Sequence, residues 1–330
     1  MYTELATTTL RSDEEATIAR VQAPDSRWGE LITPFLAHKD RVTRWQISET
    51  VIEDPSPLES YYYIAHLDGE VISNIATWEY AGSGILGHVF TAPEHRQKGA
   101  AKAVMQYQMQ DFRDRGGEAL FLGTGYDTVP YYLYKGFGFE SVTPNSGFMD
   151  YYTRSESSFE REYFAPGPTA IREIGWQDWA GLVTLFGSSQ GTWLRMFASG
   201  NTGRRNFEGD FTDLYHEVRE RGTSWGRVLE VTSSKSVVGI VRLSPDPRFG
   251  DAVHTLDVHV HPAFEADLGK LIDSVGRPVS TKVQAYVGSD DSAKLGALQD
   301  AGFAVEAIFE NQLHNGSESI DVTVLARHDG

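Results

Sequence analysis

Residues 88–105 read HVFTAPEHRQKGAAKAVM and contain the most informative pattern in the chain. An apolar strand runs into a loop rich in basic and small residues, and this loop leads directly into a helix. The first amides of a helix have no intrahelical acceptor, and the helix dipole adds partial positive charge there. Arg96 and Lys98 add cationic side chains, and Gly99 allows close approach. The pattern predicts a phosphate-binding loop, although a solvated basic turn has the same composition.

Two further patterns follow this loop in order. Residues 118–124, EALFLGT, read as a buried strand, and residues 133–139 read LYKGFGF. The loop, the helix, the strand and the L-Y-x-x-x-G-F segment together resemble the GCN5-related N-acetyltransferases, the GNAT family. In that family an R/Q-x-x-G-x-G/A loop holds the pyrophosphate of acetyl-CoA, and the later segment supplies a tyrosine. The resemblance therefore implies that acetyl-CoA is the cosubstrate.

The resemblance also implies which residues bind the coenzyme. The loop residues that match the family pattern are Arg96, Gln97, Lys98, Gly99, Ala100 and Ala101. In the family, the strand before the loop separates from the strand after the helix, and its backbone edge binds the pantetheine arm. The residues of that strand here are Val89, Phe90 and Thr91. Near Thr91 a backbone N–H is expected to stabilise the negative charge that grows on the thioester oxygen.

Tyr134 is the expected general acid, because it occupies the tyrosine position of the L-Y-x-x-x-G-F segment. A phenol is protonated at neutral pH and can give its proton to a departing thiolate. The alternative is an aromatic side chain packed in the core. Asp127 stands seven residues earlier, where many relatives have asparagine, and is expected beside the pantetheine arm. An ionised carboxylate accepts hydrogen bonds but does not donate them, so this contact differs from the family's.

The general base is less well defined by the sequence. His88 begins the strand before the loop and has a reference pKa suited to the task, and Glu79 ends the preceding strand and can act through water. Tyr80 is a weaker third candidate. A buried, hydrogen-bonded histidine is the alternative interpretation of His88. We therefore name Tyr134, His88 and Glu79 as the candidate catalytic residues.

The composition narrows the class of protein. The chain has 330 residues, of which 40% are hydrophobic and 23% charged, and it contains no cysteine. This length suggests two domains, each large enough for its own core. The lack of cysteine excludes disulfides, thiolate metal sites and a cysteine nucleophile. His259 and His261 share a strand face, but no third ligand is evident, so we expect no metal.

The net charge of −17 bears on the partners of the protein. A strongly acidic surface repels polyanions, so nucleic acid is not an expected partner, whereas an amine substrate suits this field. The chain contains no apolar run of the roughly 18 residues that a membrane span needs. The first residues lack the pattern of a signal peptide. We expect a cytoplasmic protein without a membrane partner, and a homodimer is compatible with these observations.

The two halves of the chain repeat one plan. Residues 16–36 and 169–186 each open with a short apolar strand and continue into an amphipathic helix, and a hairpin pattern follows in both halves. The halves resemble tandem GNAT folds, so the expected fold class is α+β, with two mostly antiparallel sheets flanked by helices. The expected parts are a catalytic domain at residues 1–154, a linker at residues 155–168 and a second domain at residues 169–330.

The second copy lacks the chemistry of the first. Glu265 and Asp267 stand where the first copy has its basic loop, and acidic residues repel a pyrophosphate. Leu298 stands in the position of Tyr134, and leucine can neither donate nor accept a proton. We therefore expect a degenerate second domain that shapes the substrate cleft, anchors a dimer or stabilises its partner domain.

The sequence predicts an acyl-CoA-dependent N-acetyltransferase that transfers an acetyl group directly to a primary amine of a small molecule or peptide. The alternative is a non-catalytic acyl-CoA-binding regulatory module. The loop suits both functions, and the tyrosine at position 134 favours the enzyme. Transfer from an aminoacyl-tRNA is disfavoured by the acidic charge.

Overall fold

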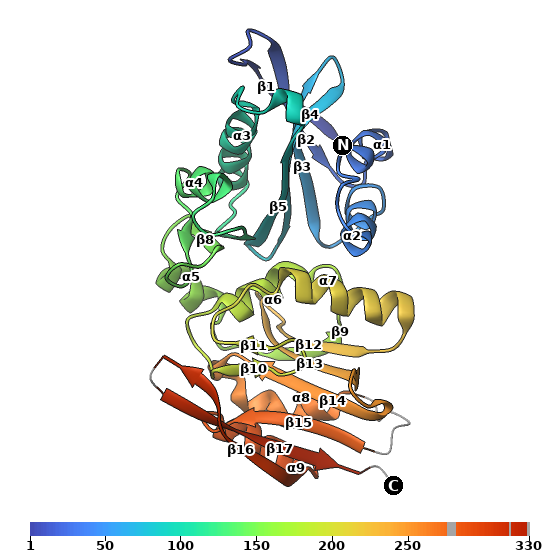
Figure 1. Cartoon of the computed structure of the whole chain (residues 1–330), viewed down its shortest axis with the longest axis vertical. Helices are drawn as coiled ribbons and strands as arrows, with labels where there is room; N and C mark the ends of the chain where they lie inside the picture. Colours follow the sequence, from blue (N-terminus) through green and yellow to red (C-terminus); the bar gives the residue numbers. More distant parts are fainter. Residues whose placement is uncertain (276–281, 317, 329–330) are drawn as a thin grey trace. The chain divides into compact units, whose positions relative to one another are not determined.

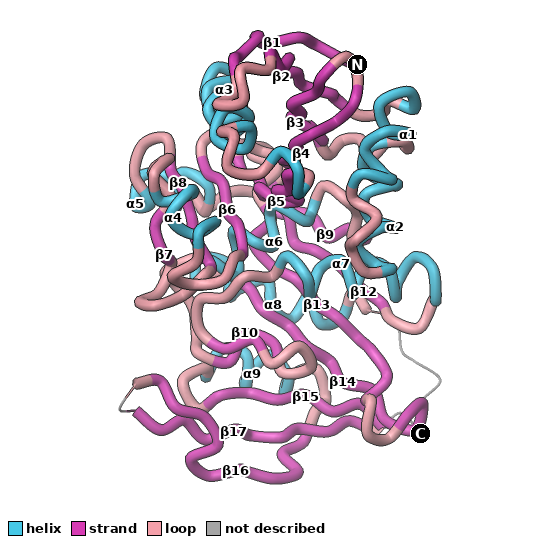
Figure 2. Tube along the Cα trace, turned by 45° about the horizontal axis from the view of Figure 1, so that its top comes forward, coloured by secondary structure: helices cyan, strands magenta, loops and turns pink. Residues whose placement is uncertain are grey.

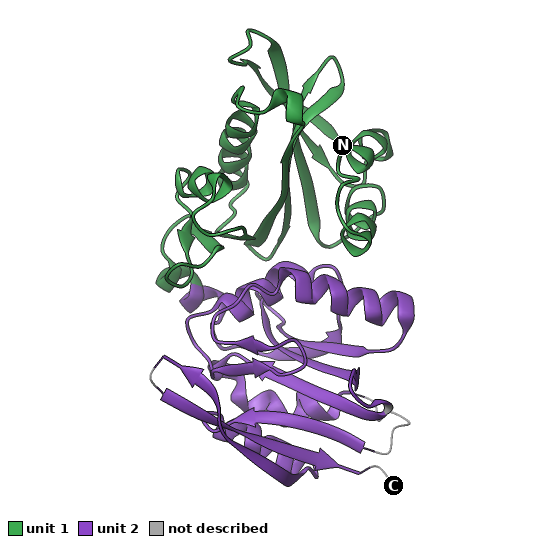
Figure 3. Cartoon of the chain, viewed as in Figure 1, with its two compact units in different colours: residues 1–159 green, residues 160–330 purple. Residues whose placement is uncertain are grey.

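The structure is a computed structural model of the chain, and it describes residues 1–275, 282–316 and 318–328. The chain divides into two compact units, coloured separately in Figure 3. The division falls after Phe159, inside helix α5 (Glu156–Tyr163) and within the predicted linker segment. Each unit contains one large, mostly antiparallel sheet with helices packed on it, which confirms the predicted α+β class.

The first unit is built on an eight-stranded sheet with the order β1-β2-β3-β4-β5-β6-β8-β7 (Figure 1). Its strands are β1 (Tyr2–Thr9), β2 (Glu15–Gln22), β3 (Glu59–Leu67), β4 (Glu70–Tyr80), β5 (Ser83–Thr91), β6 (Ala119–Gly123), β7 (Glu140–Ser141) and β8 (Phe148–Tyr152). Its helices, apart from α5, are α1 (Ser26–Phe35), α2 (Arg41–Val51), the 3-10 turn η1 (Pro93–His95), α3 (Ala100–Asp114) and α4 (Val129–Lys135).

The second unit has a seven-stranded sheet with the order β16-β17-β15-β14-β13-β12-β9 and a small β10-β11 pair. Its strands are β9 (Thr169–Glu173), β10 (Leu194–Met196), β11 (Asn201–Thr202), β12 (Trp225–Val231), β13 (Val237–Asp246), β14 (Gly250–Val260), β15 (Lys282–Gly288), β16 (Ala304–Asn315) and β17 (Glu318–Arg327). Its helices are α6 (Asp178–Gly187), α7 (Glu208–His216), η2 (Glu217–Arg221), η3 (Pro262–Asp267), α8 (Leu268–Asp273) and α9 (Ser292–Asp300).

The two sheets share one topology, as the sequence predicts. In the first unit the strands from β2 onward follow the same sequence of pairings as the strands from β9 onward in the second. Each sheet has one parallel pair, β5–β6 in the first unit and β14–β15 in the second, and its other strand pairs are antiparallel. Strand β1 has no counterpart among the described residues of the second unit, where β9 is the edge strand.

Both parallel pairs separate towards their carboxyl ends. In the first unit, pairing joins residues 83–85 of β5 to residues 119–121 of β6 and then stops in the described chain. In the second unit, residues 253–256 of β14 pair with residues 282–285 of β15, and the strands then diverge. Each sheet therefore opens a gap at the carboxyl end of its parallel pair, and in the first unit β5 is followed there by the loop and helix predicted to hold phosphate.

Helices cover both faces of the first sheet. Figure 1 shows α3 on one face and α1 with α2 on the other. Helix α1 begins after Asp25, whose carboxylate accepts the N–H of Trp28 at 3.0 Å, and α2 begins after Asp40, which caps Thr43 in the same way. The face under α3 holds a core cluster that includes Val104 and Phe112. In the described part of the chain, no helix has the length and apolar character needed to cross a membrane.

Candidate functional site

A cavity of about 670 Å³ lies at the carboxyl end of β5 in the first unit. Cavities of roughly 300–1,000 Å³ are typical of small-molecule sites. Its lining comes from the β1–β2 turn, β5, the loop after β5, α3 and α4, and consists of Arg11, Val89, Phe90, Thr91, His95, Arg96, Gln97, Gly99, Ala100, Ala101, Lys102, Val129, Pro130, Leu133 and Tyr134. The structure thus brings together eight of the ten predicted coenzyme residues and the predicted acid, Tyr134.

The loop before α3 presents its backbone amides to this cavity. Gln97 and Gly99 both adopt positive φ, +62° and +97°, which curls the loop around the start of the helix. The first intrahelical bond runs from the N–H of Ala103 to the carbonyl of Gly99, so the amides of Ala100 and Ala101 precede the ladder. No side chain caps this helix end. Such amides form an anion-binding concavity.

The charged side chains among the described residues that line the cavity are all basic, although the net charge of the chain is −17. Arg96 donates its Nε to the carbonyl of Thr91 at 3.1 Å, and its guanidinium lies 5.8 Å from the ring centre of Phe90. Arg11 and Lys102 add two cations that sequence reasoning missed. Among the described lining residues there is no aspartate or glutamate. The local field therefore favours an anion, against the field of the whole chain.

Two predicted coenzyme residues lie outside this lining. The ammonium group of Lys98 forms an ion pair with Glu14 at 3.0 Å. Asp127 is exposed, and its carboxylate accepts a hydrogen bond from the hydroxyl of Tyr132. Only the loop pattern, and not these tertiary partners, was visible in the sequence. In this structure both side chains are engaged elsewhere.

Strand β5 contains a bulge directly before the cavity. Pairing with β4 joins Gly87 to Ala76 and then Phe90 to Asn74, so β5 has one extra residue at this point. His88 takes the left-handed conformation, with φ of +51°, and its carbonyl accepts the Nδ2–H of Asn74 at 3.0 Å. A bulge bends a strand and re-aims the side chains that follow it. The bulge therefore sets the direction of the strand residues that line the cavity.

The ring of His88 points towards α2. Its Nε2 lies 2.7 Å from Oε1 of Gln46, whose own Nε2 donates to Thr50 at 2.9 Å. Because the Gln46 oxygen can only accept, Nε2 of His88 carries the proton. The indole of Trp78 packs against the ring in a T-shaped arrangement, with ring centroids 4.9 Å apart. Burial, followed by the nearby positive charge of Lys39, lowers the pKa of His88 to about 3, so the ring is neutral near pH 7.

Glu79 is not brought to the cavity. It pairs with Gly84 near the start of β5, whereas the cavity lies at the carboxyl end of that strand. Arg115 holds its carboxylate with two bonds of 2.6 and 2.9 Å, and Thr77 donates a third at 2.6 Å. Burial raises the pKa of Glu79, which the bonds from Arg115 only partly offset. Arg115 also contacts Asp111, so Glu79 belongs to a buried ion-pair network.

Tyr134 is positioned by the short helix α4. Thr128 caps this helix by accepting the N–H of Tyr131, and Val129 and Pro130 form its first turn at the cavity wall. The Tyr134 side chain is 6% exposed, belongs to the core cluster under α3 and borders the cavity. Its ring lies 6.1 Å from Phe139. Core packing therefore fixes the ring at the cavity wall, so the two interpretations made from the sequence are compatible.

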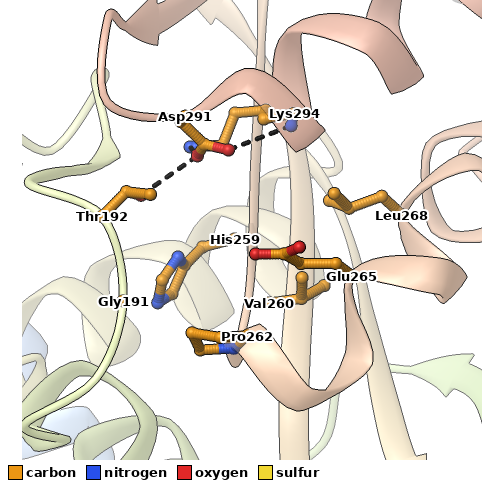
Figure 4. A pocket seen from close by; sticks show the side chains of 9 residues that line it. All are labelled: Gly191, Thr192, His259, Val260, Pro262, Glu265, Leu268, Asp291 and Lys294. Carbon is orange, nitrogen blue, oxygen red and sulfur yellow. Dashed lines mark hydrogen bonds and ion pairs between the residues drawn. The ribbon is translucent and has the colours of Figure 1, made fainter.

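In the second unit, the described residues fill most of the matching gap. The pocket that they leave there has a volume of about 10 Å³, roughly that of one water probe. Figure 4 shows this pocket, whose lining comes from β14, η3, α8, α9 and the segment after α6, and consists of Gly191, Thr192, His259, Val260, Pro262, Glu265, Leu268, Asp291 and Lys294. A carboxylate, Glu265, stands where the first unit has its cations.

The segment between α6 and α7, residues 188–207, fills this gap. The amides of Phe197 and Ala198 donate to the Asp257 carboxylate at 2.7 and 2.9 Å, beyond the point where β14 stops pairing with β15. On the other side the Phe197 ring stacks on Tyr286 of β15, with centroids 3.6 Å apart. The buried Nζ of Lys294 donates to the carbonyl of Leu194 at 3.0 Å. Figure 2 shows β10, part of this segment, beside β14.

Residues 24–139 match the family described as Acetyltransferase (GNAT) family. Residues 24–139 of the first unit are therefore similar to a GNAT acetyltransferase domain, as the loop and the tyrosine segment predict. The matched range contains every lining residue of the cavity except Arg11.

Several solved structures resemble about half of the chain. A GNAT-family acetyltransferase from Streptococcus pneumoniae is 17% identical, with 49% of this chain and 100% of that chain covered and a TM-score of 0.38. The ribosomal-protein-alanine N-acetyltransferase from Brucella melitensis is 17% identical, with 48% and 99% covered and a TM-score of 0.39. The spermidine N-acetyltransferase from Vibrio cholerae, solved with CoA and spermine, is 13% identical, with 48% and 95% covered and a TM-score of 0.39. No curated protein sequence matches the chain.

Proposed function

We propose that the first unit binds acetyl-CoA in the cavity at the end of β5 and transfers its acetyl group directly to a primary amine. The observation that carries this proposal is the meeting of three features in one cavity: uncapped helix amides, cationic side chains and the buried phenol of Tyr134. The family assignment of residues 24–139 supports the same class of reaction.

The diphosphate of the coenzyme suits the start of α3. The amides of Ala100 and Ala101 precede the first intrahelical bond and can donate to phosphate oxygens. Arg96 adds a guanidinium whose planar donors match two oxygens of one phosphate. The pantetheine arm then follows β5 into the gap, where the strand edge facing β6 has no pairing partner beyond Ile85 in the described chain. The thioester reaches the neighbourhood of Tyr134.

The reaction is an aminolysis in one active site. The amine nitrogen attacks the thioester carbonyl, its C–N bond forms, and the carbonyl oxygen becomes an oxyanion that a backbone N–H of β5 can stabilise. The C–S bond then breaks, and the phenol of Tyr134 gives its proton to the leaving thiolate. The amine loses one proton to water, and a proton from water restores the phenol. The products are an acetamide and CoA.

His88 is a weak candidate for the base because its pKa is about 3. A base of that strength removes protons inefficiently at neutral pH. We assign His88 a positioning role instead: it fixes the bulge of β5 through its bond to Gln46. Glu79, bound to Arg115 away from the cavity, takes no part in the proposed reaction. The amine therefore enters in its neutral form or loses its proton to water.

The acceptor side of β5 is the face that points towards α1. The ring of Phe90 lies 5.1 Å from Phe35 and 4.1 Å from His38, so aromatic rings border the strand on this face. Aromatic faces attract ammonium groups and also pack apolar chains. The net charge of −17 further favours a cationic acceptor. We propose a primary amine carried by a small molecule or a peptide.

Two measurements on the purified chain test the proposal. Titration calorimetry should detect acetyl-CoA binding, and a thiol-release assay across polyamines, aminoglycosides and peptides with free N-termini should detect turnover. No binding would contradict the coenzyme site. Binding without thiol release across the whole panel would favour the alternative, an acyl-CoA-binding regulatory module.

A further inference from the structure

We propose that Arg11, on the turn between β1 and β2, binds the 3′-phosphate of coenzyme A. This inference rests on the proposed function, because it assigns one more contact to the same cavity. It also goes beyond the family match, which begins at residue 24 and leaves this hairpin out. In the described part of the second unit no such hairpin is found, since its sheet ends at β9.

The hairpin turn is docked on the coenzyme loop through its backbone. The N–H of Arg11 donates to the carbonyl of Lys98 at 3.0 Å, and its Nη1 lies 3.4 Å from the carbonyl of Gln97. Leu10, the preceding residue, is 4% exposed and belongs to the core cluster under α3. The turn itself is closed by a bond from the N–H of Leu10 to the carbonyl of Glu14 at 2.8 Å. The position of Arg11 is therefore fixed by backbone hydrogen bonds and by the packing of Leu10, in addition to the contact of its guanidinium group.

Two residues of this turn determine which cation lines the cavity: Glu14 binds Lys98, and Arg11 lines the cavity itself. Glu14 binds the ammonium group of Lys98 at 3.0 Å, and Lys98 is absent from the lining of the cavity. Arg11, from the same turn, stands in that lining with an exposed side chain. A guanidinium presents a planar fork of donors that matches a phosphate, whereas an ammonium is a point charge. An arginine in the lining, in place of a lysine, suits a phosphate monoester at the mouth of the cavity.

Arg11 and Tyr134 come from elements on opposite sides of β5 in the order of the sheet. Tyr134 belongs to α4, which follows β6, whereas Arg11 belongs to the turn at the β1–β2 edge of the sheet. In coenzyme A the thioester is at one end, the diphosphate is in the middle, and the 3′-phosphate is on the ribose at the other end. If the thioester meets Tyr134 and the diphosphate meets the amides of α3, the nucleotide end points towards Arg11.

The test compares coenzyme A with dephospho-CoA, which lacks only the 3′-phosphate. Titration calorimetry at fixed, low salt gives the Kd of both ligands for the wild-type chain and for Arg11→Gln. We expect the substitution to weaken CoA binding about tenfold, the effect of one charge-assisted contact, and to change dephospho-CoA binding less than about twofold. Arg113→Gln removes the same charge from the far end of α3, outside the cavity, and should change neither Kd.

Several outcomes would overturn the assignment. An equal loss for both ligands would place Arg11 on the diphosphate, and no loss for either would remove it from the site. A wild-type chain that binds neither ligand would instead contradict the proposed function. The backbone bond to Lys98 is kept by glutamine, so the melting temperature of Arg11→Gln should match that of the wild type, and an unchanged melting temperature excludes a folding defect as the cause of any loss.

Discussion

The two units use one topology and differ in what occupies the gap beside the parallel strand pair. In the first unit the gap leads into a cavity of about 670 Å³ whose charged lining is cationic, and in the second the described residues leave a pocket of about 10 Å³ lined by Glu265, Asp291 and Lys294. The shared topology alone therefore does not create such a cavity. The connecting segments decide whether the gap stays open.

The segment between the first two helices of each unit shows this most clearly. In the first unit, residues 36–40 join α1 to α2, and in the second, residues 188–207 join α6 to α7. The longer segment carries Phe197 into the gap, where Asp257 and Tyr286 hold it. The helix after the gap also differs: α3 has 15 residues and α8 has 6. In the second unit, residues of the chain itself occupy the gap.

The largest expected effect is on the affinity for acetyl-CoA. It is tested by substituting two glycines, one at the start of α3 and one at the start of α8. Gly99→Glu places a carboxylate in the open space before α3, at a φ of +97° that side chains rarely adopt. We expect acetyl-CoA binding to weaken roughly 1,000-fold, about 4 kcal/mol, because the new charge repels phosphate. Gly269→Glu adds the same charge to the first turn of α8, where the space is also open, and should leave the Kd unchanged. Equal effects, or none at Gly99, would contradict the proposed coenzyme loop.

The next largest effect is expected at Tyr134, whose position in the second unit is occupied by Leu298. Tyr134→Phe keeps the ring in the core and removes the proton that the leaving thiolate needs. We expect kcat to fall about 100-fold, close to 2.7 kcal/mol, with an unchanged Kd for acetyl-CoA. Tyr132→Phe, an exposed neighbour on α4, is the control and should keep full activity. A Tyr134→Phe variant with wild-type kcat would leave the phenol with a packing role alone.

The number of coenzyme molecules bound per chain gives a third test of the difference between the two units. Native mass spectrometry should find one acetyl-CoA per chain, since the gap of the second unit is filled. Asp257→Ala removes the acceptor of two amides and should lower the free energy of unfolding of the second unit by about 2 kcal/mol without adding a second coenzyme. Asp300→Ala, an exposed position on α9, serves as the control. Two bound coenzymes in the wild type would contradict the closed gap.

The smallest effect concerns His88 and pH. Its folded-state pKa of about 3 lies below the unfolded value near 6.5, so its contribution to stability is present above pH 6.5 and declines as the pH falls. His88→Gln should reduce the loss of unfolding free energy between pH 7 and pH 5 by about 1.9 kcal/mol. The shape of kcat/KM between pH 6 and 8 should not change. His314→Gln on β16 is the exposed control, and a parallel loss in all three proteins would contradict the lowered pKa.

Local patterns were sufficient to predict most of the fold. The loop from Arg96 to Ala101 and the segment around Tyr134 are patterns of residues close in sequence, so they could be singled out, and most of their residues line one cavity. Their roles stay predictions. Arg11 was missed because its bond to Lys98 joins residues far apart in the chain. The position of Glu79 away from the cavity was not predicted for the same reason, since its partner Arg115 lies at the end of the helix after the loop. Residues 188–207 fill the gap of the second unit through contacts with residues that are also far away in the sequence, so the sequence did not predict this filling.

The single extra residue in β5 has a consequence for protein engineering. Val89 packs into the core under α3 while Phe90 faces α1, and this alternation depends on His88 being inserted opposite β4. Strand β14 pairs with β13 without such an insertion from Leu256 to Val260. Deleting His88 would shift the phase of the strand by half a period and send Phe90 to the opposite side. A library that varies side chains along this strand must therefore hold its length constant.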